Sequence, residues 1–209
     1  MPHRDALRHS PAAERNRQPI LDVLQRWLPP RGTMLEIASG TGQHAVHLAA
    51  GLPGWSWQPT DPDPAALASI AAWREAASLI NLLPALRLDV TTLPWPLGGP
   101  FDTVFCANLL HIAPWAVCAA LMRGAARHLD RRGRLILYGP FLIDGVATAP
   151  GNLAFDADLR ARNPAWGLRR LAEVQAVAAE QGLLLRQQLG MPMNNTMLQV
   201  GFAFRHAAA

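Results

Sequence analysis

The chain has 209 residues, half of them hydrophobic, which suffices to bury the core of one domain, and its formal net charge at pH 7 is +4. All 19 basic residues are arginines, so the isoelectric point of about 10.3 reflects the high pKa of arginine more than a large excess of charge. The arginines are scattered and form no basic patch with interleaved aromatic residues, so we expect no nucleic-acid partner.

Nothing in the sequence divides the chain or attaches it to a membrane. It has no Ser/Gly-rich linker, block of like charges or internal repeat, which predicts a single domain over residues 1–209. No apolar run approaches roughly 18 residues and the first residues are charged, so we expect a cytoplasmic protein with no membrane partner. Cys106 and Cys118 fit no metal-binding spacing and are expected to be buried thiols.

In chain order, the hydrophobic patterns predict alternating helices and strands. We expect helices over residues 12–28, 43–51, 65–80, 114–129 and 168–181, and strands over residues 33–38, 55–60, 85–88, 101–107 and 134–138. A loop-rich stretch follows residue 138, and the chain closes with strands 183–189 and 197–204 around a turn at 190–195. Five strand–helix repeats and a final hairpin predict an α/β fold with a mostly parallel, seven-stranded sheet and one antiparallel strand.

The most informative segment covers residues 35–44 and reads LEIASGTGQH. An apolar strand ends here in small residues and glycines, directly before a helix, which is the arrangement of a nucleotide-binding unit. Gly40 and Gly42 allow a positive φ or a close approach of the backbone to a ligand. Glu36 lies inside the apolar strand, and because burying an unpaired carboxylate is costly, we expect it to have a cationic or hydroxyl partner.

The glycine turn alone does not identify the nucleotide, because the spacing of Gly40, Gly42 and Ala45 also fits the dinucleotide pattern of NAD enzymes. Asp61, 21 residues after Gly40, ends the second expected strand and is placed to accept hydrogen bonds from ribose hydroxyls, which both cofactor classes carry. The alternative is that the run 61–64, DPDP, only caps and starts the next helix.

An acidic residue before a glycine-rich turn resembles the first motif of the class I methyltransferases that use S-adenosylmethionine, with Ala38 in place of the first glycine. This resemblance implies that Asp61 binds the ribose, and that Asp89, with Val90, contacts the adenine. It also implies that Asn108 and Leu109 contact the methionine part of the cofactor. Asp89 has an alternative role, because it can equally cap the turn before Thr91 and Thr92.

The chain is further identified as a member of the DUF938 family, also called UPF0585, on seven segments that span most of its length. These segments are residues 10–16, 35–46, 58–64, 101–115, 138–141, 152–166 and 192–195. The resemblance implies a Rossmann-like methyltransferase fold, S-adenosylmethionine as cofactor with S-adenosylhomocysteine as product, and a small-molecule acceptor with a hydroxyl, thiol or amine. The implied cofactor-binding residues are Glu36, Ala38, Gly40, Gly42, His44, Asp61, Asp89, Val90, Asn108 and Leu109.

Polar residues near the expected ligand-binding edge are candidates for the acceptor side. We consider Glu14, His111 and Tyr138 as catalytic candidates, and as substrate-binding candidates Asn16, Trp115, Phe141, Asn194 and Asn195. Residues 1–30 form a lid or helix segment in this interpretation.

Each candidate has a simpler explanation beside the functional one. Ser10 is a plain N-cap, Glu14 and Asn16 fit a solvated helix face, His111 fits a ring bonded to a backbone carbonyl, and paired asparagines suit a turn. His44 and His47 share a helix face, but no third ligand has suitable spacing, so we expect no metal.

Two other functions stay open from the sequence. One is a non-catalytic module that binds the adenosyl cofactor. The other is an NAD(P)-dependent oxidoreductase, although the best-known single-domain type needs a Tyr-x-x-x-Lys pair and this chain contains no lysine. The sequence does not indicate an oligomeric state.

Overall fold

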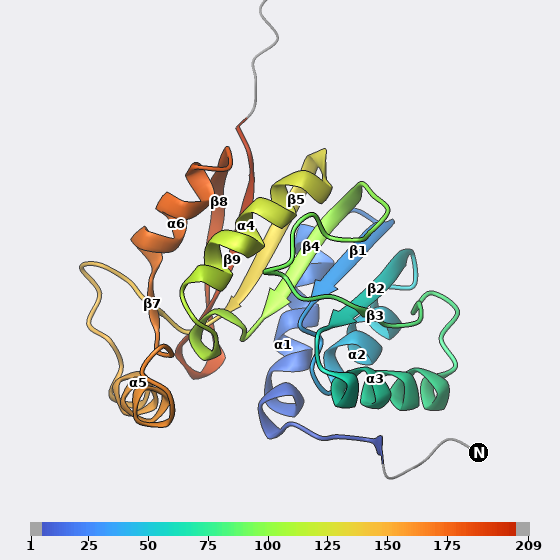
Figure 1. The fold of residues 1–209 in the computed structure, drawn as a ribbon, viewed down its shortest axis with the longest axis horizontal. Helices are drawn as coiled ribbons and strands as arrows, with labels where there is room; N and C mark the ends of the chain where they lie inside the picture. The colour runs from blue at the N-terminus through green and yellow to red at the C-terminus, as the bar shows by residue number, and fades with distance from the viewer. Residues whose placement is uncertain (1–5, 204–209) are drawn as a thin grey trace, which may run out of the picture.

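A computed structural model describes residues 6–203 and contains a seven-stranded sheet in the order β3-β2-β1-β4-β5-β9-β8, with helices on both faces (Figure 1). Among the described strands of this sheet, β9 is the one whose direction opposes that of the others, and it pairs antiparallel with both β5 and β8. The structure thus confirms the predicted mostly parallel sheet with one antiparallel strand. The strands are β1 (Gly32–Ile37), β2 (Trp55–Asp61), β3 (Leu86–Arg87), β4 (Phe101–Ala107), β5 (Leu129–Gly139), β8 (Leu183–Met191) and β9 (Asn195–Phe202).

The helices bury two separate clusters of apolar side chains, one on each face of the sheet. On one face, α1 and α2 pack against Met34 and Phe105, and on the other, α4 and α6 pack against Leu35 and Val104. Successive residues of a strand contribute to different clusters because their side chains point to opposite faces of the sheet. The helices are α1 (Pro11–Trp27), α2 (Gln43–Gly51), α3 (Pro64–Ala77), α4 (Ala116–His128), α5 (Pro150–Arg162) and α6 (Leu171–Ala179), with short 3-10 turns η2 (Leu110–Ile112) and η3 (Pro192–Asn194).

Helices α1 and α3 start in the same way, with an N-cap side chain followed by proline. The Ser10 hydroxyl accepts a hydrogen bond from the Ala13 amide (3.3 Å) before Pro11, and the Asp63 carboxylate accepts one from the Ala65 amide (2.9 Å) before Pro64. Both satisfy an amide that has no partner inside the helix. The predicted starts of α1 and α3 therefore agree with the structure to within one residue.

Helix α5 lies in the stretch that the sequence predicts to be rich in loops, and this is the largest error in the predicted element order. Its first turn contains Pro150 and Gly151, which gave the stretch the appearance of a loop. The helix nevertheless carries a helical signal, because Asp156 pairs with Arg160 and Asp158 pairs with Arg162 at i,i+4 spacing.

Several boundaries also differ from the predictions. The helix expected over 168–181 is the shorter α6, because residues 169–170 form strand β7 (Arg169–Arg170), which pairs with β6 (Phe141–Leu142). Strand β5 begins at Leu129, directly after α4, instead of near residue 134. The expected end of the last strand, Phe204, lies outside the described residues.

The cysteines confirm the sequence analysis. Cys106 and Cys118 are buried free thiols, and burial raises the pKa of Cys118 to about 12, so its thiol stays protonated at neutral pH. Within residues 6–203, no helix combines the length and the apolar character that crossing a membrane requires.

The sheet order determines where a ligand can bind. Strands β2 and β3 lie on one side of β1, and strands β4 and β5 lie on the other side. The order of the strands therefore reverses between β1 and β4. In open α/β sheets, ligands bind at the carboxyl ends of the strands at such a reversal. In Figure 1 these ends point toward the lower edge of the sheet, where α5 also lies.

Candidate functional site

The glycine turn lies at this reversal, between β1 and α2. Ala38, Gly40 and Gly42 all have a positive φ, of 54°, 57° and 87°. A Cβ added to Gly42 would lie 2.9 Å from the Cα of Ile70 on α3, whereas a Cβ added to Gly40 would have no heavy atom nearer than 4.0 Å. The turn is therefore packed against α3 on one side and is open beside Gly40.

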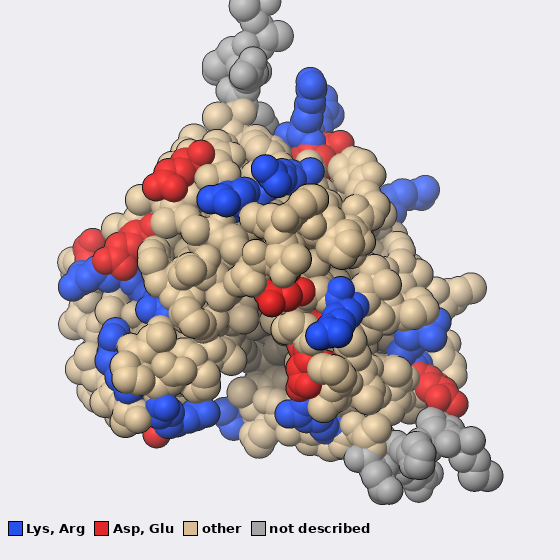
Figure 2. Space-filling model, viewed as in Figure 1, with Lys and Arg blue, Asp and Glu red and all other residues tan. Residues whose placement is uncertain are grey.

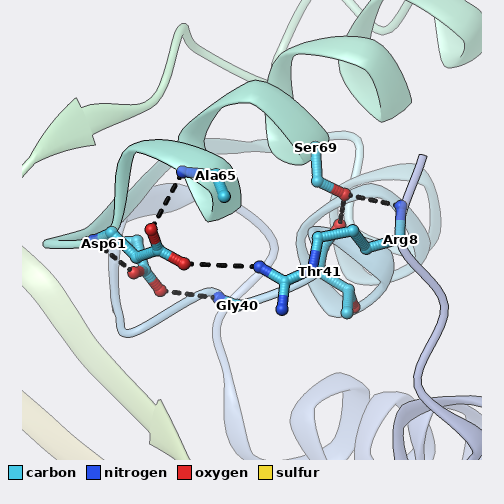
Figure 3. A network of polar contacts seen from close by, with 7 residues as sticks. Arg8, Gly40, Thr41, Asp61, Ala65 and Ser69 are labelled. Atoms are coloured by element: carbon cyan, nitrogen blue, oxygen red, sulfur yellow. Dashed lines mark hydrogen bonds and ion pairs between the residues drawn. The ribbon is translucent and has the colours of Figure 1, made fainter. Parts of the chain in front are cut away.

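Asp61 closes the turn from the end of β2. Its carboxylate accepts hydrogen bonds from the Gly40 and Asp63 amides, both at 2.9 Å (Figure 3). The capping role that was the alternative for this segment belongs to Asp63. Asp61 is only 6% exposed and lies beside the open part of the turn.

Glu36 lies within β1 and is 2% exposed. Its carboxyl accepts a hydrogen bond from the Trp57 indole N–H at 2.8 Å. Burial raises the pKa of Glu36 to about 7, while hydrogen bonds from Trp57 and the Ser39 side chain oppose that rise. The expected hydroxyl partner is thus Ser39, and the structure gives Glu36 no cationic partner among the described residues.

Asp89 follows β3 on the exposed side of the turn that it caps. Its carboxylate accepts hydrogen bonds from the Thr91 amide (2.9 Å) and hydroxyl (2.7 Å), and these bonds lower its pKa. The geometry matches the capping alternative, and both hydrogen bonds go to Oδ1, so within residues 6–203 the Oδ2 atom has no hydrogen-bond partner. Val90, which follows it, is buried in the core beside α4.

Residues 7–10, which we call the strap, cross the glycine turn before α1 begins. The Arg8 amide donates to the Ser69 hydroxyl (3.0 Å), and the Arg8 guanidinium pairs with Asp63 (3.3 Å; Figure 3). The Ser10 amide donates to the side-chain oxygen of Gln43 at 2.6 Å. Ser10 is therefore both the predicted N-cap and an anchor of the strap on α2.

The first turns of α1 and α2 are joined by side chains. Glu14 accepts a hydrogen bond from the Gln43 amide group (3.2 Å) and also pairs with Arg17, so its carboxylate points to α2 and to solvent. His44 bonds through Nε2 to the Asn16 side-chain oxygen at 2.7 Å. Burial lowers the pKa of His44 to about 4, which keeps the ring neutral at pH 7. The side chain of His44 thus joins α2 to α1.

A cleft of about 500 Å³ opens next to this junction, lined by α1, the ends of β4 and β5, α5 and the turn between β8 and β9. Figure 2 shows a hollow in this region, with acidic and basic side chains interspersed over the surrounding face. Of the acceptor-side candidates, the structure brings five to its lining: Asn16, His111, Tyr138, Asn194 and Asn195. Asn108, at the end of β4, lines it too.

His111 is one of the buried ionisable groups that line the cleft, together with Tyr138. It is 6% exposed, its ring meets Phe155 edge-on with 5.5 Å between centroids, and its nitrogens have no hydrogen-bond partner within the described chain. Burial lowers the pKa of His111 to about 4, and the charge of Arg169 adds to this effect. The alternative of a ring bonded to a backbone carbonyl does not match this geometry.

Three acceptor-side candidates lie elsewhere. Trp115 is partly exposed and stacks on the Arg169 guanidinium, 5.6 Å from the ring centroid. Phe141 is buried in the core cluster of α4 and α6. Glu14, as described above, faces α2.

The structure also adds residues to the site that the sequence analysis did not single out. Asn152 on α5 donates a hydrogen bond to the Asn194 carbonyl at 3.0 Å and so joins α5 to the hairpin turn. Arg15, Phe155 and Met193 line the cleft. Recognising α5 as a helix would have placed Asn152 and Phe155 three residues apart on one face, which is the signal that could have found them.

Within residues 6–203 no group of three or more His, Cys, Asp or Glu side chains is arranged to hold a metal ion. His47, the neighbour of His44 on α2, bonds to the Gln18 side chain at 3.0 Å.

Comparison with known proteins identifies a family and a fold. A family model described as "Protein of unknown function (DUF938)" matches residues 7–201. An O-methyltransferase family protein from Burkholderia thailandensis has a similar structure, with a TM-score of 0.77 and 19% identity, covering 92% of this chain and 57% of that one. An O-methyltransferase family 2 protein from Planctomyces limnophilus, in complex with apigenin, has a TM-score of 0.77, 18% identity and coverages of 92% and 60%.

A third similar structure is CalO1, a methyltransferase in calicheamicin biosynthesis, in its SAH-bound form. Its TM-score is 0.73 at 16% identity, with coverages of 92% and 55%. At such identities the likeness establishes the class I methyltransferase fold. The chain spans a little more than half the length of these three proteins.

Proposed function

The chain belongs to the DUF938 family, and from its site we propose that it is an S-adenosylmethionine-dependent methyltransferase acting on a small molecule. The observation that carries this proposal is the adjacency of the glycine turn and the cleft. Ile37 pairs with Cys106 across β1 and β4, so Ala38 and Asn108, the first residues after these strands, emerge at the same edge of the sheet with an offset of one residue. Both have a positive φ, near 55°, as the chain turns out of the sheet.

The residues present fit an adenosyl cofactor. The open space beside Gly40 leaves the turn accessible, and the buried Asp61 carboxylate beside it can accept hydrogen bonds from ribose hydroxyls. Glu36, Ala38 and Gly42 shape the turn, and His44 fixes α2 against α1 through Asn16. We assign the adenine contact to Asp89 and Val90, and the contact with the methionine part to Asn108 and Leu109.

The bound cofactor supplies a methyl group that is already activated on a sulfonium. The protein then has to align the acceptor with that group and exclude water. Asn16, Asn194 and Asn195 offer amide groups for orientation, and His111 offers a neutral ring nitrogen. Burial raises the pKa of Tyr138, so its hydroxyl stays protonated and able to donate.

Two of the similar structures add support. One was solved with SAH and another with apigenin, a small molecule. The interspersed charges in Figure 2 likewise favour a small-molecule partner over a nucleic acid.

Calorimetry with S-adenosylmethionine, S-adenosylhomocysteine and NAD tests the cofactor. We expect the adenosyl compounds to bind and NAD to bind far more weakly. Asp61→Asn should lower S-adenosylhomocysteine affinity by roughly 1 to 3 kcal/mol, because ribose hydroxyls lose a charged acceptor. Asp63→Asn is the matched control, since Asn also caps a helix. Equal or better NAD binding would refute the assignment.

Transfer itself requires a second measurement. Incubation with methyl-labelled cofactor and a panel of phenols, thiols and amines should label at least one compound. Tight cofactor binding without any labelled product would instead favour the non-catalytic cofactor-binding module.

We further propose that the strap and the start of α1 cover the bound cofactor. Backbone and side-chain contacts from Arg8 and Ser10 already hold this segment over the turn. Closing segments exclude water from a reaction. Hydrogen exchange should therefore slow in residues 7–16 when S-adenosylhomocysteine is added, and unchanged exchange would leave the segment as a structural helix start.

A further inference from the structure

The charges around the cleft indicate the chemistry of the acceptor. Among residues 6–203, its lining contains no Asp or Glu and only one charged side chain, that of Arg15. Arg15 has no carboxylate partner among residues 6–203, and its charge acts on the Tyr138 hydroxyl inside the cleft. Five asparagines contribute amide groups, and the rest of the lining is mainly apolar, including Ile112, Phe155 and Met193.

Carboxylates on the elements around the cleft are engaged away from it. On α1, Glu14 bonds to Gln43 and pairs with Arg17. On α5, Asp156 pairs with Arg160 and accepts a hydrogen bond from the Leu168 amide, and Asp158 pairs with Arg162. The nearby cation Arg169 disfavours a proton on His111. Among the described residues, an ammonium group in the cleft would therefore meet a cation and no counter-charge.

The same groups give the cleft no effective base. The pKa of His111 is lowered to about 4 by burial, and Tyr138 is a donor at neutral pH because burial raises its pKa. A base works best when its pKa lies near the working pH. Neither of these two side chains is therefore suited to take a proton from an acceptor near neutral pH.

We propose that the acceptor is an apolar acid whose reacting oxygen or sulfur is already an anion at neutral pH, held with Arg15 as counter-charge; this rests on the proposed function. The electron pair of the anion forms the new bond to the methyl carbon. The bond from that carbon to the cofactor sulfur breaks, and its electron pair stays on sulfur. No proton is released, so the reaction needs no base, and His111 and the asparagines act by positioning.

Binding of three matched naphthalene compounds tests the proposal without requiring turnover. We expect 1-naphthoate to bind protein saturated with S-adenosylhomocysteine about tenfold more tightly than 1-naphthamide, and 1-naphthylmethylammonium to bind most weakly. Arg15→Gln should remove the advantage of naphthoate over naphthamide, whereas the control Arg17→Gln, two residues along α1, should keep it. Equal binding of acid and amide, or an equal loss in both variants, would overturn the proposal.

The pH dependence of transfer gives an independent test. With labelled cofactor and phenols of graded acidity, the pH midpoint of kcat/KM should follow the ionisation of each phenol in solution. A midpoint that stays constant across the phenols would reveal a base on the protein and overturn the proposal. Naphthoate binding without any S-adenosylhomocysteine binding would instead overturn the proposed cofactor while supporting the anion site.

Discussion

The glycine turn and the cleft lie side by side at one edge of the sheet, but they are built in different ways. The turn comes from one contiguous segment, its shape is a matter of backbone angles, and its neighbours Glu36, Asp61 and Asp89 are acidic. The cleft is assembled from side chains more than 170 residues apart, from Ser10 to Asn195, and its charge is basic. Changes in the turn should therefore affect folding and cofactor affinity, whereas changes in the cleft should affect the acceptor.

The largest effect should come from Gly42→Ala. The new methyl group would meet the Ile70 backbone at 2.9 Å, and the residue would have to keep a φ of 87°. Backbone strain and overpacking together should lower the free energy of unfolding by about 3 kcal/mol, measured by urea denaturation. Gly190→Ala is the control, because a Cβ there meets nothing within 4 Å. Similar losses in both variants would contradict the close packing of the turn.

Glu36→Gln should change the pH dependence of stability. Because the pKa of Glu36 is raised from 4.5 to about 7 in the folded protein, its contribution is present below pH 4.5 and is lost as the pH rises to about 7. Wild-type stability should thus fall by up to about 3 kcal/mol over this window relative to the variant, which has no proton to lose. The comparison cancels the opposite contributions of His44 and His111, whose lowered pKa values favour folding at higher pH. Parallel curves for the two proteins would show that folding does not shift the pKa of Glu36.

Ala38→Gly should stabilise the protein. Ala38 has a φ of 54°, a conformation that costs an L-residue about 1 to 2 kcal/mol and costs glycine little. After the larger entropy of an unfolded glycine is subtracted, we expect a gain of about 0.5 to 1 kcal/mol in unfolding experiments. The control Ala68→Gly, at an exposed position of α3, should lose about 1 kcal/mol. A loss at residue 38 would mean that its methyl group contributes packing that outweighs the strain.

The smallest effect on the cofactor should come from the cleft. His111→Ala should leave S-adenosylhomocysteine affinity within roughly threefold and lower kcat/KM for an acceptor found in the labelled panel, as expected for an interaction made with the acceptor. Asn194→Ala should behave in the same way. If either variant binds the cofactor poorly, the division between turn and cleft is wrong at that residue.

The sequence predicted the turn better than the cleft for a physical reason. A strand, a glycine turn and a following helix are local, so residues 35–44 and Asp61 could be placed from spacing alone. The cleft depends on contacts between distant segments, such as the bond from Asn152 to Asn194, and on a helix whose first residues, Pro150 and Gly151, resemble a loop. The placement of Trp115 on Arg169 likewise depends on packing that spacing does not encode.

Helix α1 links the two regions. Its first turn is bonded through Glu14 to Gln43 at the start of α2, and the next residues, Arg15 and Asn16, line the cleft. Any shift of α1 that accompanies cofactor binding must move one wall of the acceptor cleft. Coupling between two sites is reciprocal, so a bound acceptor should tighten the cofactor by the same factor that the cofactor tightens the acceptor. We therefore expect the cofactor and the acceptor to bind cooperatively or in a fixed order, with helix α1 coupling their two sites.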